Sequence, residues 1–143
     1  MKGKLNESEA ILNKAGLKKT LPRVALLELL LTSKKPISAN ILFEKLKKDK
    51  ADKVTVYRTL DVLEKKGLIK RVNTGEREAQ YEIADHIEDH HHVICLSCKK
   101  ISDFTGCDAD ILITKALKQV KDFKLIKHHS FDLFGICNAC SKK

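Results

Sequence analysis

The sequence predicts an α+β chain in two parts: an N-terminal winged helix-turn-helix domain over residues 1–84, then a small α/β domain over residues 85–143. Three observations support this fold class. Helical periodicity fills the first part and ends in two β-prone runs around a glycine turn, the order of a winged helix. The second part alternates β-prone runs with one helical segment. All 5 cysteines and all 6 histidines lie in the second part.

Four helical segments make up most of the first part. The first covers residues 6–15 and ends at a glycine, which is a frequent stop signal. Thr20 is placed to cap the second, with Pro22 in its first turn, where the missing N–H costs nothing. Ser38 is placed to cap the third. The fourth covers residues 55–66 and is also followed by glycine.

Strand signals follow the fourth helix. Runs 68–72 and 79–83 flank a turn at 73–76 and predict a two-stranded wing. Residues 85–89 are polar and predict a hinge. Beyond it the predicted strands are 91–95, 101–104 and 123–136, and the predicted helix is 108–120. The product is a small sheet with one covering helix.

The net charge of +9 is concentrated in the first part. Up to Ala84 there are 19 Lys and Arg against 11 Asp and Glu, and beyond it 9 against 8. By itself this bias fits a solvated lysine-rich surface as well as a face that binds a polyanion. The sequence has no apolar run of bilayer length and no apolar signal-peptide core, so we expect a cytoplasmic location.

The helix before the predicted wing carries side chains suited to DNA. One face of it is apolar, and the residues expected outside are Lys53, Thr55, Tyr57, Arg58 and Thr59. Arg58 can bind phosphate or guanine, and Tyr57 can contact a thymine methyl and a phosphate. The competing interpretation is that Tyr57 packs under the wing and Arg58 is solvated. Cations at the start of the second helix, placed near the DNA backbone or minor groove, are Lys18, Lys19 and Arg23.

Four of the cysteines form two C-x-x-C pairs, Cys95 with Cys98 and Cys137 with Cys140. In a reducing compartment such thiols are metal ligands or free thiols rather than disulfides. Two such pairs brought together give tetrahedral sulfur coordination, which Zn²⁺ favours, and four thiolates leave no open position for catalysis. The alternatives are unrelated thiol pairs or a redox C-x-x-C. Cys107 is the odd thiol, and its simplest interpretation is a small half-buried residue.

Histidines and carboxylates are dense just before the first cysteine pair. If residues 90–92 are extended, His90 and His92 face one way while Asp89 and His91 face the other, which makes one site on each face. Imidazole with carboxylate suits Fe²⁺, Mn²⁺, Zn²⁺ or Ni²⁺. The competing interpretation is a solvated polar loop.

The order and spacing of these motifs resemble the ferric uptake regulator (Fur) family over nearly the whole chain. The matching segments are 16–23, 36–39, 54–60, 90–95 and 135–140, together with His129. The resemblance implies a metal-dependent transcriptional repressor that binds pseudo-palindromic operators as a homodimer and controls iron or zinc uptake, with residues 85–143 as the dimerisation domain.

The resemblance also implies two metal sites besides the zinc. The sensory site would use Glu82, His90, His92 and Asp103, with His86 as a substitute ligand because the segment before His90 is one residue longer than usual. The second site would use Asp89, His91, Asp110 and His129. The implied cofactors are structural Zn²⁺ and a regulatory Fe²⁺ or Zn²⁺, with Mn²⁺ as a further candidate.

One departure bears on the branch of the family. The iron and peroxide branches carry a further sensory histidine before the third helix, where this chain has Pro36. Peroxide sensing uses that histidine, so a peroxide-responsive repressor is the alternative rather than the leading hypothesis. The Pro36–Ala39 form also occurs in the zinc-uptake branch, and the choice between iron and zinc stays open.

Two hypotheses from other classes remain. A metallohydrolase would use the histidine cluster with an open coordination position, but the sequence has no H-E-x-x-H pair, nucleophile elbow or phosphate-cradling loop, so we expect no enzyme. A constitutive zinc-stapled nucleic-acid-binding protein would lack metal-dependent affinity.

Overall fold

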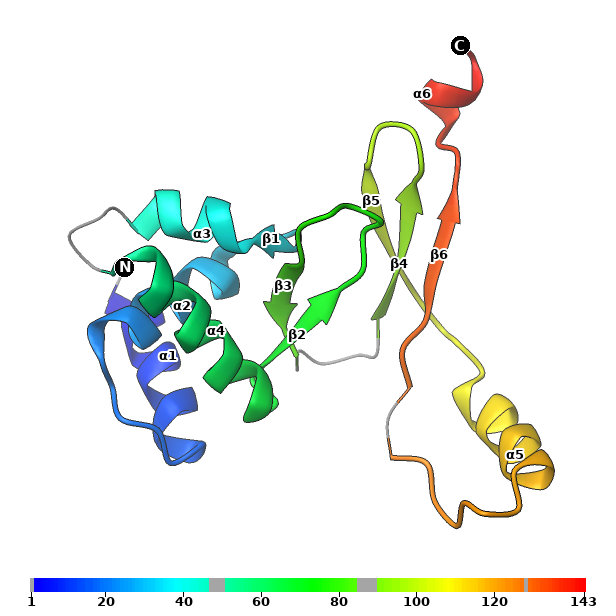
Figure 1. The fold of residues 1–143 in the computed structure, drawn as a ribbon, viewed down its shortest axis with the longest axis horizontal. Helices are drawn as coiled ribbons and strands as arrows, with labels where there is room; N and C mark the ends of the chain where they lie inside the picture. The colour runs from blue at the N-terminus through cyan, green and yellow to red at the C-terminus, as the bar shows by residue number, and fades with distance from the viewer. Residues whose placement is uncertain (1, 47–50, 85–89, 128) are drawn as a thin grey trace. The chain divides into compact units, whose positions relative to one another are not determined.

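The computed structural model describes residues 2–46, 51–84, 90–127 and 129–143 and divides into two compact units, Met1–His86 and Ile87–Lys143 (Figure 1). The predicted hinge at 85–89 lies outside the described residues. No helix in the described part of the chain is long and apolar enough to span a membrane. The elements of the first unit are α1 (Lys2–Lys14), α2 (Leu21–Thr32), β1 (Ile37–Ser38), α3 (Ala39–Leu46), α4 (Lys53–Lys65), β2 (Ile69–Val72) and β3 (Gln80–Ile83).

Side-chain caps fix where two of these helices begin. The Asp52 carboxylate accepts the Thr55 N–H at 2.7 Å, which starts α4 two residues earlier than predicted. The Ser38 hydroxyl accepts the Ile41 N–H at 3.3 Å at the start of α3, as predicted. Thr20 has the extended backbone of an N-cap, but its side chain makes no capping hydrogen bond, so that part of the prediction is wrong.

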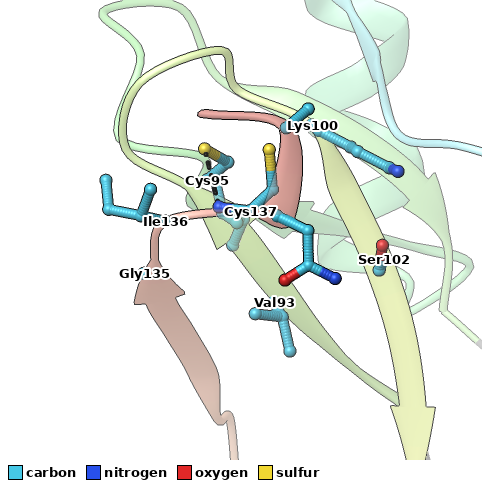
Figure 2. A pocket seen from close by; sticks show the side chains of 10 residues that line it. Val93, Cys95, Lys100, Ser102, Gly135, Ile136 and Cys137 are labelled. Carbon is cyan, nitrogen blue, oxygen red and sulfur yellow. Dashed lines mark hydrogen bonds between the residues drawn. The ribbon is translucent and has the colours of Figure 1, made fainter. Parts of the chain in front are cut away.

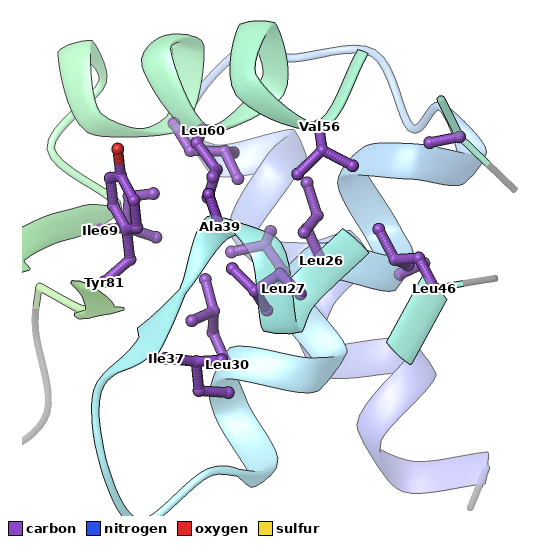
Figure 3. Packing of buried hydrophobic residues seen from close by; sticks show 14 of the residues in the cluster. Leu26, Leu27, Leu30, Ile37, Ala39, Leu46, Val56, Leu60, Ile69 and Tyr81 are labelled. Atoms are coloured by element: carbon purple, nitrogen blue, oxygen red, sulfur yellow. The ribbon is translucent and has the colours of Figure 1, made fainter. Parts of the chain in front are cut away.

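The first unit has a continuous hydrophobic core (Figure 3). α2, α3 and α4 each turn one apolar face inward, and the wing closes the side that the helices leave open. Each fully buried aliphatic side chain stabilises the fold by about 1.5–3 kcal/mol, before the entropy of ordering the chain is counted. The fully buried leucines that these three helices contribute are Leu26, Leu27, Leu42, Leu60 and Leu63.

The wing has three strands, in the order β1-β3-β2, where the sequence predicted two. The predicted hairpin is confirmed, since β2 and β3 pair antiparallel with Lys70 opposite Glu82. The unexpected strand is β1, which places Ile37 opposite Tyr81. A two-residue strand has no alternation to detect, so the hydrophobic pattern could not reveal it.

The second unit contains β4 (His90–Cys95), β5 (Ile101–Thr105), α5 (Ala109–Gln119), β6 (Asp132–Gly135) and α6 (Asn138–Ser141). β4 is the central strand, antiparallel to β5 and parallel to β6. The predicted strand over 123–136 is wrong except for β6. Phe123 and Leu125 are 63% and 64% exposed. β-propensity reflects packing on a half-buried pleated surface, and these residues have none.

The second unit has little core of its own. Among the described residues of this unit, Ile94 is the fully buried aliphatic side chain, and no residue of α5 is buried. Ile111 and Leu112 of α5 are 56% and 58% exposed, and α5 stands away from the sheet (Figure 1). The prediction of a helix that covers the sheet is therefore wrong for the single protomer. The apolar face of α5 is left for another surface to cover.

Candidate metal centres and nucleic-acid interface

Four cysteine sulfurs come together at the end of the second unit. The parallel pairing of β4 with β6 places Cys95 opposite Gly135, which brings the second C-x-x-C pair beside the first. The ligand atoms of Cys95, Cys98, Cys137 and Cys140 all lie within 4.8 Å of one another. All four cysteines are free, and the Sγ atoms of Cys98 and Cys137 are 3.7 Å apart, far beyond a disulfide bond.

Backbone N–H groups favour the thiolate form of Cys95, the form that binds a cation. The Cys137 N–H donates to the Cys95 sulfur at 3.4 Å (Figure 2), and with the Cys98 N–H it lowers the pKa of Cys95 to about 6. The pKa of Cys140 moves the other way. A hydrogen bond with Ser97 lowers it, but those with the Cys137 and Cys98 thiols outweigh this and raise it to about 11. Neighbouring thiolates repel one another, and a divalent cation removes that repulsion.

The donor set fits Zn²⁺, which binds four thiolates tetrahedrally in structural sites. A cavity of ≈ 320 Å³ borders the cluster (Figure 2). β4 and β5 line it on one side and the segment from Gly135 to Ala139 on the other. A zinc here would fasten the end of the chain to the start of the sheet, which gives the ion a role in folding.

The three consecutive histidines of β4 alternate as an extended strand requires. The ring centroids of His90 and His92 are 5.1 Å apart, so these two share one face. His91 points to the other face, where its ring lies 5.3 Å from that of His129 and 5.5 Å from that of Phe104. The predicted alternation is confirmed for the three histidines.

His92 lies between two carboxylates. Both carboxylate residues are its register partners, Asp103 on β5 and Asp132 on β6. Its Nε2 is 3.7 Å from Asp103 Oδ1, and its Nδ1 is 3.5 Å from Asp132 Oδ1. The sequence reasoning selected Asp103 but missed Asp132, because nothing local reveals which strand pairs parallel to β4.

The remaining sensory candidates are placed as follows. Glu82 lies on β3 of the first unit, where its carboxylate is 3.2 Å from Lys70 Nζ and its side chain is 14% exposed. A cation that binds Glu82 must therefore compete with an ammonium group. His86 and Asp89 lie outside the described residues.

A second cluster lies on the opposite face of β4. The ligand atoms of His91, Cys107 and His129 all lie within 4.8 Å of one another. Cys107 is half-buried, as expected, but its sulfur does more than fill space: it is 2.9 Å from His91 Nε2 and 3.4 Å from His129 Nε2. Asp110 is exposed in the first turn of α5 and is not in this group. No local pattern marks Cys107 as a ligand, because Cys107 has no cysteine or histidine nearby in the chain.

α4 presents polar side chains outside the core of the first unit. Lys53 and Arg58 are exposed, and Tyr57 is 43% exposed, so the interpretation that Tyr57 is packed under the wing is wrong. Thr55 is half-buried. Thr59, predicted to be outside, is only 7% exposed because it lies on the face that packs inward.

Other cations lie on the surface of the first unit. The Arg23 guanidinium donates to the Lys18 carbonyl at 3.0 Å, which fixes the entrance to α2. Lys19 pairs with Glu9 at 2.9 Å. The wing adds Arg71, whose guanidinium lies 5.6 Å from the Tyr81 ring centroid and which the sequence reasoning did not select.

A winged helix with a cationic helix before the wing, followed by a unit built around thiolate and imidazole clusters, defines the class of metal-responsive transcriptional repressors. Comparisons with known proteins agree. A sequence model described as "Ferric uptake regulator family" matches residues 14–134. The chain therefore belongs to the ferric uptake regulator family.

Individual relatives are similar over nearly the full length. The peroxide operon regulator of Bacillus subtilis (strain 168) is 32% identical over 143 residues, covering 97% of this chain and 94% of its own. The ferric uptake regulator of Helicobacter pylori, whose structure is described as revealing three functional metal binding sites, has a TM-score of 0.75 at 28% identity, covering 99% and 94%. An iron-containing ferric uptake regulator from Francisella tularensis has a TM-score of 0.71 at 30% identity, covering 88% and 96%.

Proposed function

We propose that this chain is a homodimeric repressor in which a regulatory cation, bound by the second unit, controls how tightly α4 binds a pseudo-palindromic operator. Residues 1–84 bind the DNA and residues 85–143 bind metal and form the dimer. The observation that carries the proposal is the alternation of His90, His91 and His92 on β4, which places an imidazole cluster on each face of one strand directly before the zinc cysteines.

The regulatory cation is held on the face of His90 and His92. Asp103 supplies a carboxylate from the adjacent strand, Glu82 supplies one from the wing of the first unit, and His86 is the substitute ligand. Imidazole and carboxylate together suit Fe²⁺, Zn²⁺ or Mn²⁺ and allow reversible binding. Binding of the cation would favour the DNA-binding state of the protein, which is how metal would raise operator affinity.

The dimer follows from the surface of the second unit. A soluble domain rarely leaves a large set of apolar side chains in water, and a second copy that covers the same surface gives a two-fold interface. Two reading helices related by that axis match an operator with two half-sites. The large apolar side chains exposed on the second unit include Ile111, Leu112, Phe123, Leu125, Leu133, Phe134 and Ile136.

The DNA interface is centred on the outer face of α4. Arg58 and Tyr57 would contact bases and phosphates, with Lys53 and Thr55 beside them. Lys18, Lys19 and Arg23 at the entrance to α2 would bind the backbone or the minor groove. Every phosphate contact of this kind releases counterions, so affinity should fall steeply with salt.

We assign no catalytic role. Four thiolates fill the zinc coordination sphere, and a metallohydrolase would need an open position with a nucleophile or base beside it. We place the protein in the cytoplasm, because five free cysteines arranged mostly as ligands suit a reducing compartment. A peroxide-responsive repressor is the alternative within the family, and the 32% identity to the B. subtilis peroxide operon regulator favours it.

The deciding experiment measures operator affinity as a function of free metal. A duplex is selected by the metal-loaded protein from random sequence, and its binding is followed by fluorescence anisotropy at buffered Fe²⁺, Mn²⁺, Zn²⁺ and Ni²⁺, with the cysteine-bound zinc retained. We expect the regulatory metal to raise affinity by at least about tenfold, the range of ordinary allosteric coupling. Equal affinity of the loaded and unloaded protein would refute the sensing role.

Matched variants locate the interface. Arg58→Gln should weaken binding by about 1–3 kcal/mol if the guanidinium reads a base. Lys45→Gln removes the same charge from an exposed position of α3 and should have a small effect. If both variants weaken binding equally and by the same amount on all sequences, α4 does not read the operator.

A further inference from the structure

We propose that Cys107 is a metal ligand, and that with His91 and His129 it makes a two-nitrogen, one-sulfur site for a borderline or soft divalent cation such as Zn²⁺. The inference rests on the proposed function only in treating residues 85–143 as the metal-binding unit; the resemblance implies a second site that includes His91. What it adds is the thiolate, which changes which cations the site selects.

The geometry of the three groups is the first argument. An ion with bonds of about 2.3 Å to sulfur and about 2.0 Å to nitrogen separates the two ligand atoms by about 3.5 Å at a tetrahedral angle. The Cys107 sulfur is 3.4 Å from His129 Nε2 and 2.9 Å from His91 Nε2. The longer contact already fits the ion, and the shorter one must lengthen by about 0.6 Å, a shift that side-chain rotation can supply.

The three groups can also present lone pairs to a single ion. A thiol carries one hydrogen, and each neutral imidazole directs either a lone pair or an N–H from Nε2, depending on the tautomer. Once the thiol has lost its hydrogen and both imidazoles carry theirs on Nδ1, a cation at the centre can use one lone pair from each of the three atoms.

The surroundings suit a retained ion. His91 is 5% exposed, and the rings of Phe104 and Phe131 lie 5.5 Å and 5.7 Å from its own. These rings exclude water from one side of the cluster and strengthen the attraction between ion and ligands. On the other side Cys107 borders a cavity of ≈ 420 Å³ lined from Gly106 to Ile111, which offers an entry path and room for a fourth ligand.

A thiolate alters selectivity in a defined direction. Thiolate and imidazole donors favour Zn²⁺ and Co²⁺ over the harder Mn²⁺, whereas a site built from carboxylates favours the harder ions. Asp110 provides the contrast, because the resemblance names it as the ligand from this segment while its carboxylate lies outside the cluster. Cys107 would bind the ion through sulfur and Asp110 through oxygen, so the absorption spectrum of bound Co²⁺ can distinguish the two.

The test is a Co²⁺ titration of protein that retains zinc at its four-cysteine site. Only cobalt bound to sulfur gives an intense near-ultraviolet charge-transfer band, and zinc content is measured to show that the four cysteines stay occupied. We expect the wild-type protein to develop this band, and Cys107→Ser to lose it together with at least about tenfold in affinity for the second ion. Asp110→Asn is the matched control and should keep the band.

The cobalt spectra of the two variants test whether Cys107 is a ligand. A band that persists in Cys107→Ser, or vanishes in Asp110→Asn, overturns the proposal. Should Cys107→Ser fail to fold, cobalt-edge X-ray absorption of the loaded wild-type protein replaces it: one sulfur with two imidazoles supports the site, and only nitrogen and oxygen neighbours refute it. No DNA is used, so a chain that fails to bind an operator can still show the band, and the proposed function can hold without it.

Discussion

Replacing Cys98 by serine should unfold the second unit while leaving the first intact. Cys98 is exposed, and serine differs from cysteine by one atom, so the substitution removes a zinc ligand without disturbing packing. Among the described residues of this unit, Ile94 is the aliphatic side chain that is fully buried, and it contributes about 1.5–3 kcal/mol. A structural zinc contributes about 10–16 kcal/mol, so the ion outweighs the core several-fold.

The helix lengths give the expected loss of the circular dichroism signal. The helices of the first unit have 13, 12, 8 and 13 residues and those of the second have 11 and 4. Loss of the second unit should therefore remove about a quarter of the helical circular dichroism, as local unfolding of one unit would. Amide NMR signals of β4 should collapse to unfolded positions while those of α4 stay dispersed.

Ser102→Ala is the control, because Ser102 is exposed on β5 and lies near the cluster without being a ligand. It should retain one zinc per chain and the full spectrum. If Cys98→Ser is shown to be free of zinc and still gives dispersed signals from β4, the zinc does not hold the second unit folded. If the first unit unfolds together with the second, the two units are not independent.

Three further predictions concern separate parts of the chain. Leu60→Ala, at a fully buried site in α4, should lower the free energy of unfolding of the first unit by about 2–5 kcal/mol, measured by urea titration. A change below about 1 kcal/mol would mean that the core is not packed as described. Asp132→Asn should weaken regulatory metal binding by about 10–100-fold in calorimetry, because Asp132 orients the His92 ring; an unchanged affinity would remove Asp132 from the site. Ile111→Lys should shift the dimer to monomer in sedimentation, because it puts a charge on the exposed apolar face of α5, and a stable dimer would place the interface elsewhere.

The sequence predicted the first unit better than the second, for a physical reason. The helices around Leu26, Leu42 and Leu60 bury their apolar faces against one another, so periodicity and burial report the same face. In the second unit Ile111 and Phe123 are apolar but exposed. There the apolar pattern reflects a surface that a partner would cover. Interpreted within one chain, the pattern wrongly predicted that the helix covers the sheet and that a long strand spans residues 123–136.

The metal ligands that could be predicted are those that local sequence spacing brings together. The cysteine quartet could be predicted because a short spacing makes both members of each pair reach one ion. The alternation of His90 and His91 followed from the strand itself. Asp132 and Cys107 could not be predicted, because each contacts a histidine that is distant in the sequence. Asp132 contacts His92 through the pairing of β6 with β4, and Cys107 contacts His91 after the chain reverses direction between β4 and β5. Contacts of that kind depend on register, and a one-residue change of register moves a side chain to the other face.

The contrast between the two units bears on how metal can control DNA binding. The first unit folds around its own hydrophobic core, so we expect its reading helix to keep the same shape with or without metal. The second unit buries so little apolar surface that its stability must come from ions and from a second copy. Anything that binds only the ordered form of this unit shifts the population toward it by mass action. We therefore expect metal to act on the population of the ordered dimer rather than on the reading helices themselves. The strength of that control is limited by how much more tightly the cation binds the ordered form than the other forms.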